Sequence, residues 1–322
     1  MIKIKNIVKK ILPVADIFVL PLVYTAALLL KLIRRVGVNN MPYSKAVFMK
    51  IGVFPIINHY YEPLFNTQNL SRPLNQVRSL PGIDFNEVEQ IALLEKFNFN
   101  DEFKLIDINK TDELRFHINN SAFASGDAEY FYNLIRFKKP SRIYEIGSGL
   151  STLLAIQAIQ KNKDENSTYT CEHLCIEPYE MPWLEKAGVK VIRNLVENVD
   201  KSLFLALEEN DILFIDSSHI IRPQGDVLYE YLELLPILKV GVIVHVHDIF
   251  SPRDYLKEWI VDEVKFWNEQ YLLEAFLTAN KEWKVIGALN FLHHRHFDKL
   301  KKSCPFLSEE REPGSFYIQK II

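Results

Sequence analysis

Acidic and histidine side chains gather in two short segments in the second half of this 322-residue chain. Asp216 and His219 stand three residues apart, and His245, His247 and Asp248 follow about thirty residues later. A histidine with a pKa near neutrality can take the proton of a hydroxyl group. Carboxylates near it can orient the histidine or bind a divalent metal that lowers the pKa of the hydroxyl. The two segments therefore suggest a site for proton transfer, metal binding or both.

A glycine turn preceded by an acidic residue forms a third segment, Glu145-Ile-Gly-Ser-Gly149. It is predicted to connect a strand over residues 143–146 to a helix that begins near Ser151. The two glycines allow a tight turn and the close approach of a ligand, and the start of the helix offers free N–H groups. The segment therefore predicts a ligand-binding turn.

The carboxylate ahead of this turn distinguishes it from the common phosphate-binding loops. A carboxylate repels phosphate but suits a cationic amino group. No lysine follows the turn as in a P-loop, and Thr152 stands where the dinucleotide-binding fingerprint has its third glycine. Taken alone, the segment is also compatible with an ordinary strand-to-helix connection.

Strands and helices alternate through the rest of the chain, which predicts a mostly parallel sheet flanked by helices. The expected strands are 143–146, 171–176, 189–192, 212–215, 242–246, 283–292 and 315–318, and the expected helices include 86–97, 128–137, 151–160, 198–208, 226–238 and 256–278. Continuous apolar strands agree with burial on both faces of the sheet. Ligands of such sheets bind beyond the carboxyl ends of the strands, where all three segments fall. We therefore expect these segments to form one rim.

The three segments together resemble those of class I S-adenosylmethionine-dependent methyltransferases, over about residues 121–322. The resemblance rests on the acid and glycines of the turn, on Glu177 after the second strand and on Phe-Ile-Asp216 after the fourth. It implies a seven-stranded Rossmann-like α/β sandwich whose last strand is antiparallel, with S-adenosylmethionine as the cofactor. The residues it places at the cofactor are Glu145, Gly147, Ser148 and Gly149 around the methionine part, Glu177 on the ribose, and Asp216, with Ser125, Gly126 and Asp127 as further candidates.

Within that class, Asp216-x-x-His219 followed by His247-Asp248 is similar to two metal-dependent groups, the macrocin-type sugar O-methyltransferases and the cephalosporin-hydroxylase-like proteins. There an aspartate and a later acidic pair hold Mg²⁺, and the histidine is the base. The resemblance implies the same role for His219, with Asp216, His247 and Asp248 binding a divalent metal or orienting the base. His247 stands in place of an acid, and an imidazole suits Mn²⁺, Fe²⁺ or Zn²⁺ better than Mg²⁺. The identity of the metal therefore stays open.

The function expected from this resemblance is O-methylation of a sugar or a similar polar small molecule. Two other classes of function stay open: an NAD(P)-dependent oxidoreductase of Rossmann type, and a non-catalytic cofactor-binding or membrane-associated scaffold module. In a purely structural interpretation, Asp216 caps a turn and His245 is a hydrogen-bonded core histidine. Cys171, His173 and Cys175 alternate along a strand, match no common zinc spacing and are expected to be buried.

The first forty residues differ in composition from the rest of the chain. Four lysines lead into an apolar stretch, 11–30, and Lys31, Arg34 and Arg35 follow it. Its uncharged part, residues 17–30, is shorter than the roughly 20 residues that span a bilayer, and it contains Pro21. We expect residues 11–35 either to form a helix lying on a membrane surface or to pack on the main domain or on a second subunit of a homo-oligomer.

The composition of the chain limits its possible partners and its cellular compartment. A net charge of −3 without a basic stripe argues against a nucleic-acid partner, and three cysteines fit a reducing compartment. We therefore expect a cytoplasmic enzyme, with membrane association left open. Its predicted regions are the apolar and basic segment 1–40, an accessory or lid region 41–120, and the methyltransferase-like domain 121–322.

Overall fold

The computed structural model describes the backbone of residues 2–322 and the side chains from Leu12 onward. The chain forms two compact units, of which the first ends at Ser71 and the second is Arg72–Ile322. Each unit has its own internal contacts and is described by itself.

A seven-stranded sheet forms the centre of the second unit, with the order β3-β2-β1-β4-β5-β7-β6. The strands are β1 Arg142–Ile146, β2 Glu172–Ile176, β3 Lys190–Ile192, β4 Ile212–Ile215, β5 Ile243–Val246, β6 Trp283–Ala288 and β7 Phe316–Lys320. The first five strands pair in parallel, and β7 is antiparallel to both of its neighbours. The predicted seven-stranded sandwich with an antiparallel last strand is confirmed.

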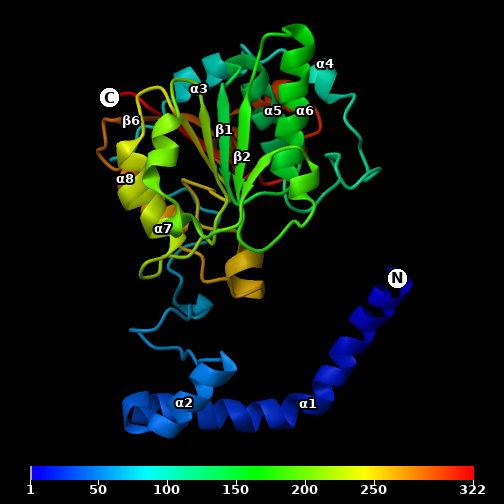
Figure 1. Cartoon of the computed structure of the whole chain (residues 1–322). Helices are drawn as coiled ribbons and strands as arrows, with labels where there is room; N and C mark the ends of the chain where they lie inside the picture. Colours follow the sequence, from blue (N-terminus) through cyan, green and yellow to red (C-terminus); the bar gives the residue numbers. More distant parts are fainter. Residues whose placement is uncertain (1) are drawn as a thin grey trace. The chain divides into compact units, whose positions relative to one another are not determined.

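Helices cover both faces of this sheet (Figure 1). Helices α5 (Asp127–Lys138) and α6 (Leu150–Glu165) lie on one side, and α7 (Asp226–Tyr229) and α8 (Glu269–Leu277) lie on the other. Successive residues of β4 enter two separate hydrophobic clusters: Ile212 and Phe214 belong to one, Leu213 and Ile215 to the other. This alternation explains why the strand is apolar at every position.

Residues 72–120 belong to the same compact unit as the sheet. Helices α3 (Glu87–Leu94) and α4 (Asn100–Phe103) lie in this stretch, and Phe97, Phe103 and Phe116 are buried in the hydrophobic cluster that also contains residues of α5. The observed boundary at residue 71 therefore differs from the expected boundary at residue 120. Aromatic residues spaced irregularly in a loop-rich stretch gave no periodic signal of this packing.

Several predicted helices are shorter than expected or replaced by tighter turns. The helix expected over 198–208 consists of the 3₁₀ turns η4 Val196–Asn198 and η5 Lys201–Ala206. After α7 the chain continues as the π-helical turn η6 Glu230–Leu234 and the 3₁₀ turn η7 Leu235–Ile237, where Pro236 cannot donate a helical hydrogen bond. The helical region expected over 256–278 holds the π-helical turn η8 Glu258–Asp262 and helix α8.

The strand predicted over 283–292 is too long. Strand β6 ends at Ala288, and helix α9 (Leu289–Ser303) begins at the next residue. Leu289, Leu292 and Leu300 are buried, and they fit one face of a helix better than one face of a strand. The basic segment 293–302 is therefore helical, with a kink at His296.

The first unit contains helix α1 (Ile2–Val36), the 3₁₀ turn η1 Val38–Asn40, helix α2 (Pro42–Ile51) and the 3₁₀ turn η2 Thr67–Asn69. Gly37 separates α1 from η1 with a φ of 92°, a value that glycine adopts without steric cost. Arg34, near the end of α1, forms an ion pair with Glu62, and its guanidinium lies 5.0 Å from the centre of the Phe54 ring. These contacts hold the segment around residues 54–62 next to the end of the helix.

Candidate active site

The carboxyl ends of β4 and β5 bring the two acidic and histidine segments together. The strands are parallel neighbours, and Ile215 pairs with Val246. Asp216 and His247, the next residue on each strand, therefore lie side by side. The sheet register alone joins segments that are thirty residues apart in the chain.

The four predicted side chains form one polar cluster. Asp216 Oδ1 lies 3.3 Å from His219 Nε2 and 3.6 Å from His247 Nδ1. Asp248 lies 3.6 Å from the same His219 nitrogen through Oδ2 and 3.3 Å from the same His247 nitrogen through Oδ1. Each carboxylate thus faces both imidazoles. The structure brings together all the residues predicted for catalysis and for metal binding.

Two members of this cluster have strained backbone conformations. His219 has a φ of 60° and Asp248 a φ of 58°, both in the left-handed region that non-glycine residues rarely adopt. Each such residue costs on the order of 1 kcal/mol and persists where its surroundings hold it. The backbone oxygen of His219 accepts hydrogen bonds from the N–H groups of Asn268 and Glu269. These two hydrogen bonds hold His219 in its strained conformation. These backbone conformations turn the side chains of His219 and Asp248 into the cluster.

Glu269 is a site residue that the sequence analysis missed. It is fully buried on α8, and its Oε2 lies 2.8 Å from His219 Nδ1. Its Oε1 accepts a hydrogen bond of 3.0 Å from the Tyr231 hydroxyl. A carboxylate on Nδ1 keeps the proton on that nitrogen and leaves Nε2 free to accept one. The ring of Trp267, with its centre 4.3 Å from that of His219, limits the other movements of the imidazole.

Only a weak signal in the sequence pointed to Glu269. Glu269 and Glu274 are acids in a stretch that is otherwise rich in apolar and aromatic residues. Both are buried in the structure. An acid on the buried face of a helix requires a partner, but the sequence does not say which one.

Charges within the cluster shift the pKa values of its members in opposite directions. Burial alone would lower the pKa of His219, but its hydrogen bonds with Asp216 and Glu269 outweigh burial and raise it. Burial likewise opposes the charge of His247, whereas Asp248 and Asp216 raise its pKa to about 9. Burial would raise the pKa of Asp216, but the two histidines hold it below its usual value. The neighbouring carboxylates therefore make the imidazoles of His219 and His247 stronger bases than a free histidine, and Asp216 is ionised beside them.

His245 lies in the core and not in this cluster. Its ring is fully buried among aromatic side chains, 4.1 Å from the centre of Phe214 and 4.6 Å from that of Tyr317. Burial lowers its pKa, so the ring is neutral. Neither ring nitrogen has a hydrogen-bond partner among the described residues, so the expectation of a hydrogen-bonded core histidine is wrong in that respect.

The glycine turn packs directly on the first residue of this cluster. Gly147 has a φ of 76°, and a Cβ atom built on it would lie 2.0 Å from the backbone oxygen of Asp216. The next residue, Ser148, donates its backbone N–H to Glu177 Oε2 over 3.3 Å. The Glu177 side chain also accepts the N–H groups of Tyr179 and Glu180. Gly147, Ser148, Glu177 and Asp216 therefore form a continuous rim, and binding of the cofactor there stays a prediction.

Glu145 lies beneath this turn with both carboxylate oxygens engaged. Its Oε2 accepts hydrogen bonds from Ser151 Oγ (2.8 Å) and Thr152 Oγ1 (3.1 Å), and its Oε1 contacts His173 Nε2. Glu145 is fully buried. The structure thus gives it a role in holding the start of α6 against β2; direct contact between Glu145 and a cofactor stays a prediction.

A buried group beneath the turn, Glu145, His173 and Cys175, also has the proximity of metal ligands. Burial raises the pKa of the Cys175 thiol, which disfavours the thiolate that binds metals. The Glu145 oxygens already have partners. The buried structural role expected for His173 and Cys175 is the better interpretation, whereas Cys171, which was expected to be buried with them, is only half-buried.

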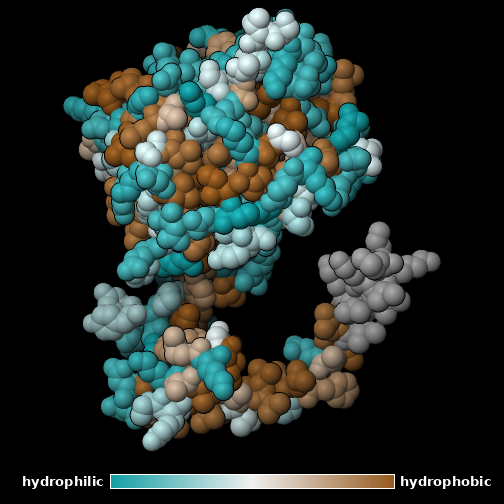
Figure 2. Space-filling model, in the orientation of Figure 1, coloured by the Kyte–Doolittle hydropathy of each residue, from teal (hydrophilic) through white to brown (hydrophobic). Residues whose placement is uncertain are grey.

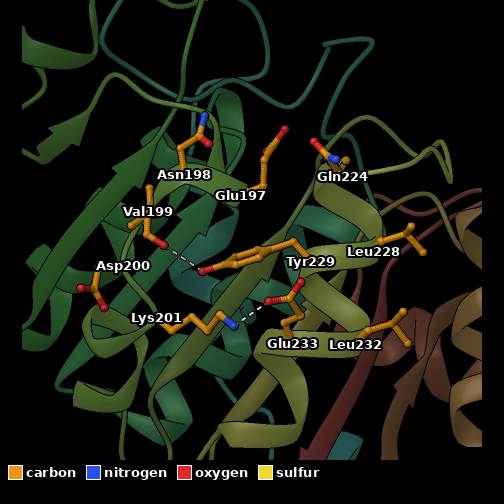
Figure 3. Close-up of a pocket in the computed structure, with 11 residues that line it drawn as sticks. Glu197, Asn198, Val199, Asp200, Lys201, Gln224, Leu228, Tyr229, Leu232 and Glu233 are labelled. Carbon is orange, nitrogen blue, oxygen red and sulfur yellow. Dashed lines mark hydrogen bonds and ion pairs between the residues drawn. The ribbon is translucent and has the colours of Figure 1, made fainter.

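An open groove of about 790 Å³ lies elsewhere on the second unit, between the turns after β3 and helix α7 (Figure 3). Its polar walls are largely paired with each other: Tyr229 donates its hydroxyl to the Val199 carbonyl over 2.9 Å, and Lys201 pairs with Glu233. None of the predicted site residues lines this groove. We therefore place the active site at the strand ends.

Comparison with known proteins defines the class. The sequence profile of a family described as a methyltransferase domain matches residues 144–249. An Archaeoglobus fulgidus protein described as uncharacterized is 32% identical over 186 residues, which cover 52% of this chain and 80% of that protein.

Three solved structures share part of the architecture. The O-methyltransferase TomG from Streptomyces achromogenes in complex with SAM has 14% identity and a TM-score of 0.38, over 72% of this chain and 90% of that one. An O-methyltransferase from Bacillus cereus in complex with SAH has 13% identity and a TM-score of 0.37, over 70% of this chain and 99% of that one. CmcI with Mg and SAM has 12% identity and a TM-score of 0.36, over 63% of this chain and 74% of that one.

The profile match and the order of the seven strands define a class I S-adenosylmethionine-dependent methyltransferase. The chain belongs to this class, in one family with the Archaeoglobus fulgidus protein. The profile match supports methyl transfer over the NAD(P)-dependent oxidoreductase considered from the sequence. Methyl transfer from S-adenosylmethionine is the activity of this class.

Proposed function

We propose that this enzyme transfers the methyl group of S-adenosylmethionine to an oxygen atom of a sugar or similar polar acceptor, with His219 as the general base. The observation that supports this proposal is the pairing of His219 Nδ1 with Glu269 at 2.8 Å. It leaves Nε2 turned toward the cluster of Asp216 and Asp248 at the rim of the sheet. A histidine held in this way by a carboxylate is suited to accept a proton.

The donor is assigned to the rim formed by the glycine turn. We place its methionine part at Gly147, Ser148 and Gly149, the turn that leads into α6. Glu177 is assigned to the ribose diol, because its carboxylate stands beside the Ser148 N–H. Glu145 supports the turn from below through Ser151 and Thr152.

The reaction requires alignment and removal of one proton. The acceptor oxygen attacks the methyl carbon of the sulfonium, the carbon–sulfur bond breaks, and S-adenosylhomocysteine leaves as a neutral thioether. The hydroxyl proton passes to His219 Nε2, while Glu269 stabilises the resulting imidazolium through Nδ1–H. Asp216 and Asp248 face the same nitrogen and hold the ring in place.

The polar cluster also fits a divalent metal. His247 is 4% exposed, and neither of its ring nitrogens has a hydrogen-bond partner among the described residues, although Nδ1 faces two carboxylates. Such an unpaired buried nitrogen beside Asp216 and Asp248 is suited to a metal ligand. A bound ion would lower the pKa of the acceptor hydroxyl. We assign Asp216, His247 and Asp248 to it. The ligand atoms that lie within 4.8 Å of one another belong to Asp216, His219 and Asp248, so an ion held through His219 would replace the role of that histidine as the base. The imidazole of either histidine favours Mn²⁺, Fe²⁺ or Zn²⁺ over Mg²⁺.

Calorimetric titration of the full-length protein with S-adenosylhomocysteine, followed by an acceptor screen with labelled donor, tests the proposal. We expect binding of the product and labelling of at least one hydroxyl compound. His219→Ala is expected to keep the affinity for S-adenosylhomocysteine and to lose turnover. Unchanged turnover in His219→Ala would show that another group is the base, and labelling of nitrogen acceptors alone would contradict O-methylation.

A further inference from the structure

Helix α1 is longer than the sequence indicated. It continues without interruption from Ile2 to Val36, although Pro13 and Pro21 lie inside it and the helix bends (Figure 1). Within it, Leu12–Val36 is long enough and apolar enough to cross a membrane. At 1.5 Å per residue these 25 residues extend about 37 Å, against roughly 30 Å for the hydrocarbon core of a bilayer.

The apolar side chains of α1 lie on all its sides. Four consecutive residues, which complete a full turn, are all exposed: Ile17 67%, Phe18 81%, Val19 47% and Leu20 57%. Figure 2 shows the hydrophobic colour continuing along the helix beyond its grey atoms. A helix that lies in the membrane surface has one apolar face and one charged face. Between Ile17 and Leu30, α1 has no charged residue on any side.

The polar groups of α1 have positions that suit a bilayer. Thr25 donates its hydroxyl to the Pro21 carbonyl over 2.9 Å, so that this polar group is satisfied within the helix. Lys31 and Arg35 are close to the C-terminal end, where long side chains can reach the lipid head groups, whereas Arg34 pairs with Glu62. Asp16 lies near the other edge and away from the centre.

Aromatic residues gather beside the C-terminal end of α1. Arg34 pairs with Glu62 and lies over Phe54, so the segment that contains Tyr60 and Tyr61 is held at this end. The two tyrosines are 90% and 85% exposed. Tyrosine is enriched at the boundary between lipid and water because its ring is apolar and its hydroxyl is polar.

We propose that α1 crosses a lipid bilayer as a single-span anchor and that the tyrosine-containing segment around residues 54–62 lies at the membrane surface next to its C-terminal end. The all-round apolar surface favours crossing over lying on the membrane. The basic residues that follow the apolar part favour a lipid surface over a parallel pairing with a second copy of the chain, because like charges would meet in such a pair.

Extraction of membranes from cells that express the full-length chain tests this proposal. We expect the protein to stay in the membrane pellet after washes with high salt and with alkaline carbonate, and to be released by detergent. Release by carbonate would mean surface attachment and would overturn the proposal. Recovery of the wild type in the soluble fraction as an oligomer would overturn it in favour of pairing through α1.

A variant with two charged residues in α1 tests the same proposal. Phe18→Arg combined with Leu22→Arg places two charges on residues that are 81% and 72% exposed, and we expect at least a tenfold loss from the membrane pellet. Val88→Arg, on an 80% exposed residue of α3, is the matched control and is expected to stay in the pellet. Equal recovery of both variants in the pellet would overturn the proposal. Titration with S-adenosylhomocysteine reports on the cofactor site separately.

Labelling of one introduced cysteine at a time provides a measurement that does not depend on a destabilising change. In open membrane sheets, a water-soluble maleimide is expected to modify Tyr43→Cys and to leave Leu22→Cys unmodified until detergent is added. Rapid labelling of Leu22→Cys before detergent would contradict a bilayer span. The chain without substitutions gives the background of the three native cysteines.

Discussion

The backbone oxygen of Asp216 occupies the position where a side chain on Gly147 would begin: a Cβ atom there would lie 2.0 Å from that oxygen. The contact joins the end of β4 to the turn after β1. Any residue other than glycine at 147 must push the two apart or leave the φ of 76°.

Gly147→Ala is therefore expected to destabilise the domain and to lower the affinity for S-adenosylhomocysteine at least tenfold. Gly149→Ala is the control, because its Cβ would meet only Met181 at 3.8 Å and its φ of −179° is ordinary extended backbone. We expect Gly149→Ala to melt near the wild-type temperature. Thermal unfolding and calorimetric titration of both variants measure the difference, and equal melting temperatures would contradict the close contact.

Glu269→Gln is expected to lower kcat by about 10²–10³ while leaving the affinity for S-adenosylhomocysteine unchanged. The reason is that Glu269 holds His219 Nδ1 and stabilises the imidazolium, and general acid–base catalysis contributes about 10²–10⁴ in rate. Glu274→Gln, a second buried acid on α8, is the control and is expected to keep kcat, because its partners are Arg78 and Ser251. A kcat of Glu269→Gln equal to that of the wild type would show that His219 does not depend on this carboxylate.

Metal binding is expected to require Asp248. Protein treated with a chelator and then given Mn²⁺ should show a higher melting temperature and a paramagnetic resonance signal of bound Mn²⁺. Asp248→Asn should lose both effects, because the variant has one fewer charged oxygen ligand. Asp254→Asn, which pairs with Arg78, is a control outside the cluster. The absence of any metal effect on the wild type would assign the cluster to orienting the base.

Glu129 is expected to make the protein less stable as the pH rises. Burial raises its pKa to about 7, although the N–H groups of Gly126 and Phe306 oppose the shift. Between its unfolded pKa near 4.3 and about 7, the folded protein holds a proton that the unfolded chain releases, so stability falls across that range. The free energy of unfolding of the wild type relative to Glu129→Gln should fall by about 3 kcal/mol between pH 4 and pH 8. Denaturant unfolding at both pH values measures it, and a constant difference would contradict the shift.

The Arg136 guanidinium is a buried charge that joins two acids of the second unit. It is fully buried, donates to Glu102 Oε2 over 2.7 Å and pairs with Glu165. Arg136→Ala is expected to cost about 3 kcal/mol of unfolding free energy, because it leaves polar partners without their cation. Lys104→Ala, which breaks only the exposed pair with Asp101, is expected to leave stability almost unchanged. Urea unfolding measures the free energy of unfolding of both variants, and equal values for the two would contradict the role of Arg136.

The sheet could be predicted from the sequence because its signals are local. An apolar run such as residues 212–215 is bounded by polar residues, and the acid and glycines of the turn lie within five residues. The register of parallel strands then places Asp216 beside His247 without further information. The cluster at the strand ends was predictable for the same reason.

The remaining parts depend on contacts between distant residues. Glu269 reaches His219 across fifty positions, and residues 72–120 join the core through scattered aromatic side chains. Glu145 was read as a residue facing the ligand because its position after the strand was visible. Its buried partners, Ser151, Thr152 and His173, depend on the packing of α6 and β2. The uncharged part of the first segment, residues 17–30, was judged too short for a bilayer, but the helix that contains it runs from Ile2 to Val36, because a proline can bend a helix without ending it.

Residues 37–71 are the only covalent link between α1 and the unit that carries the active site. With α1 in a bilayer, this link confines the enzyme to a thin layer of solution along the lipid. Encounters with an acceptor in the same layer then follow lateral diffusion, and turnover scales with the number of acceptor molecules per unit area of membrane.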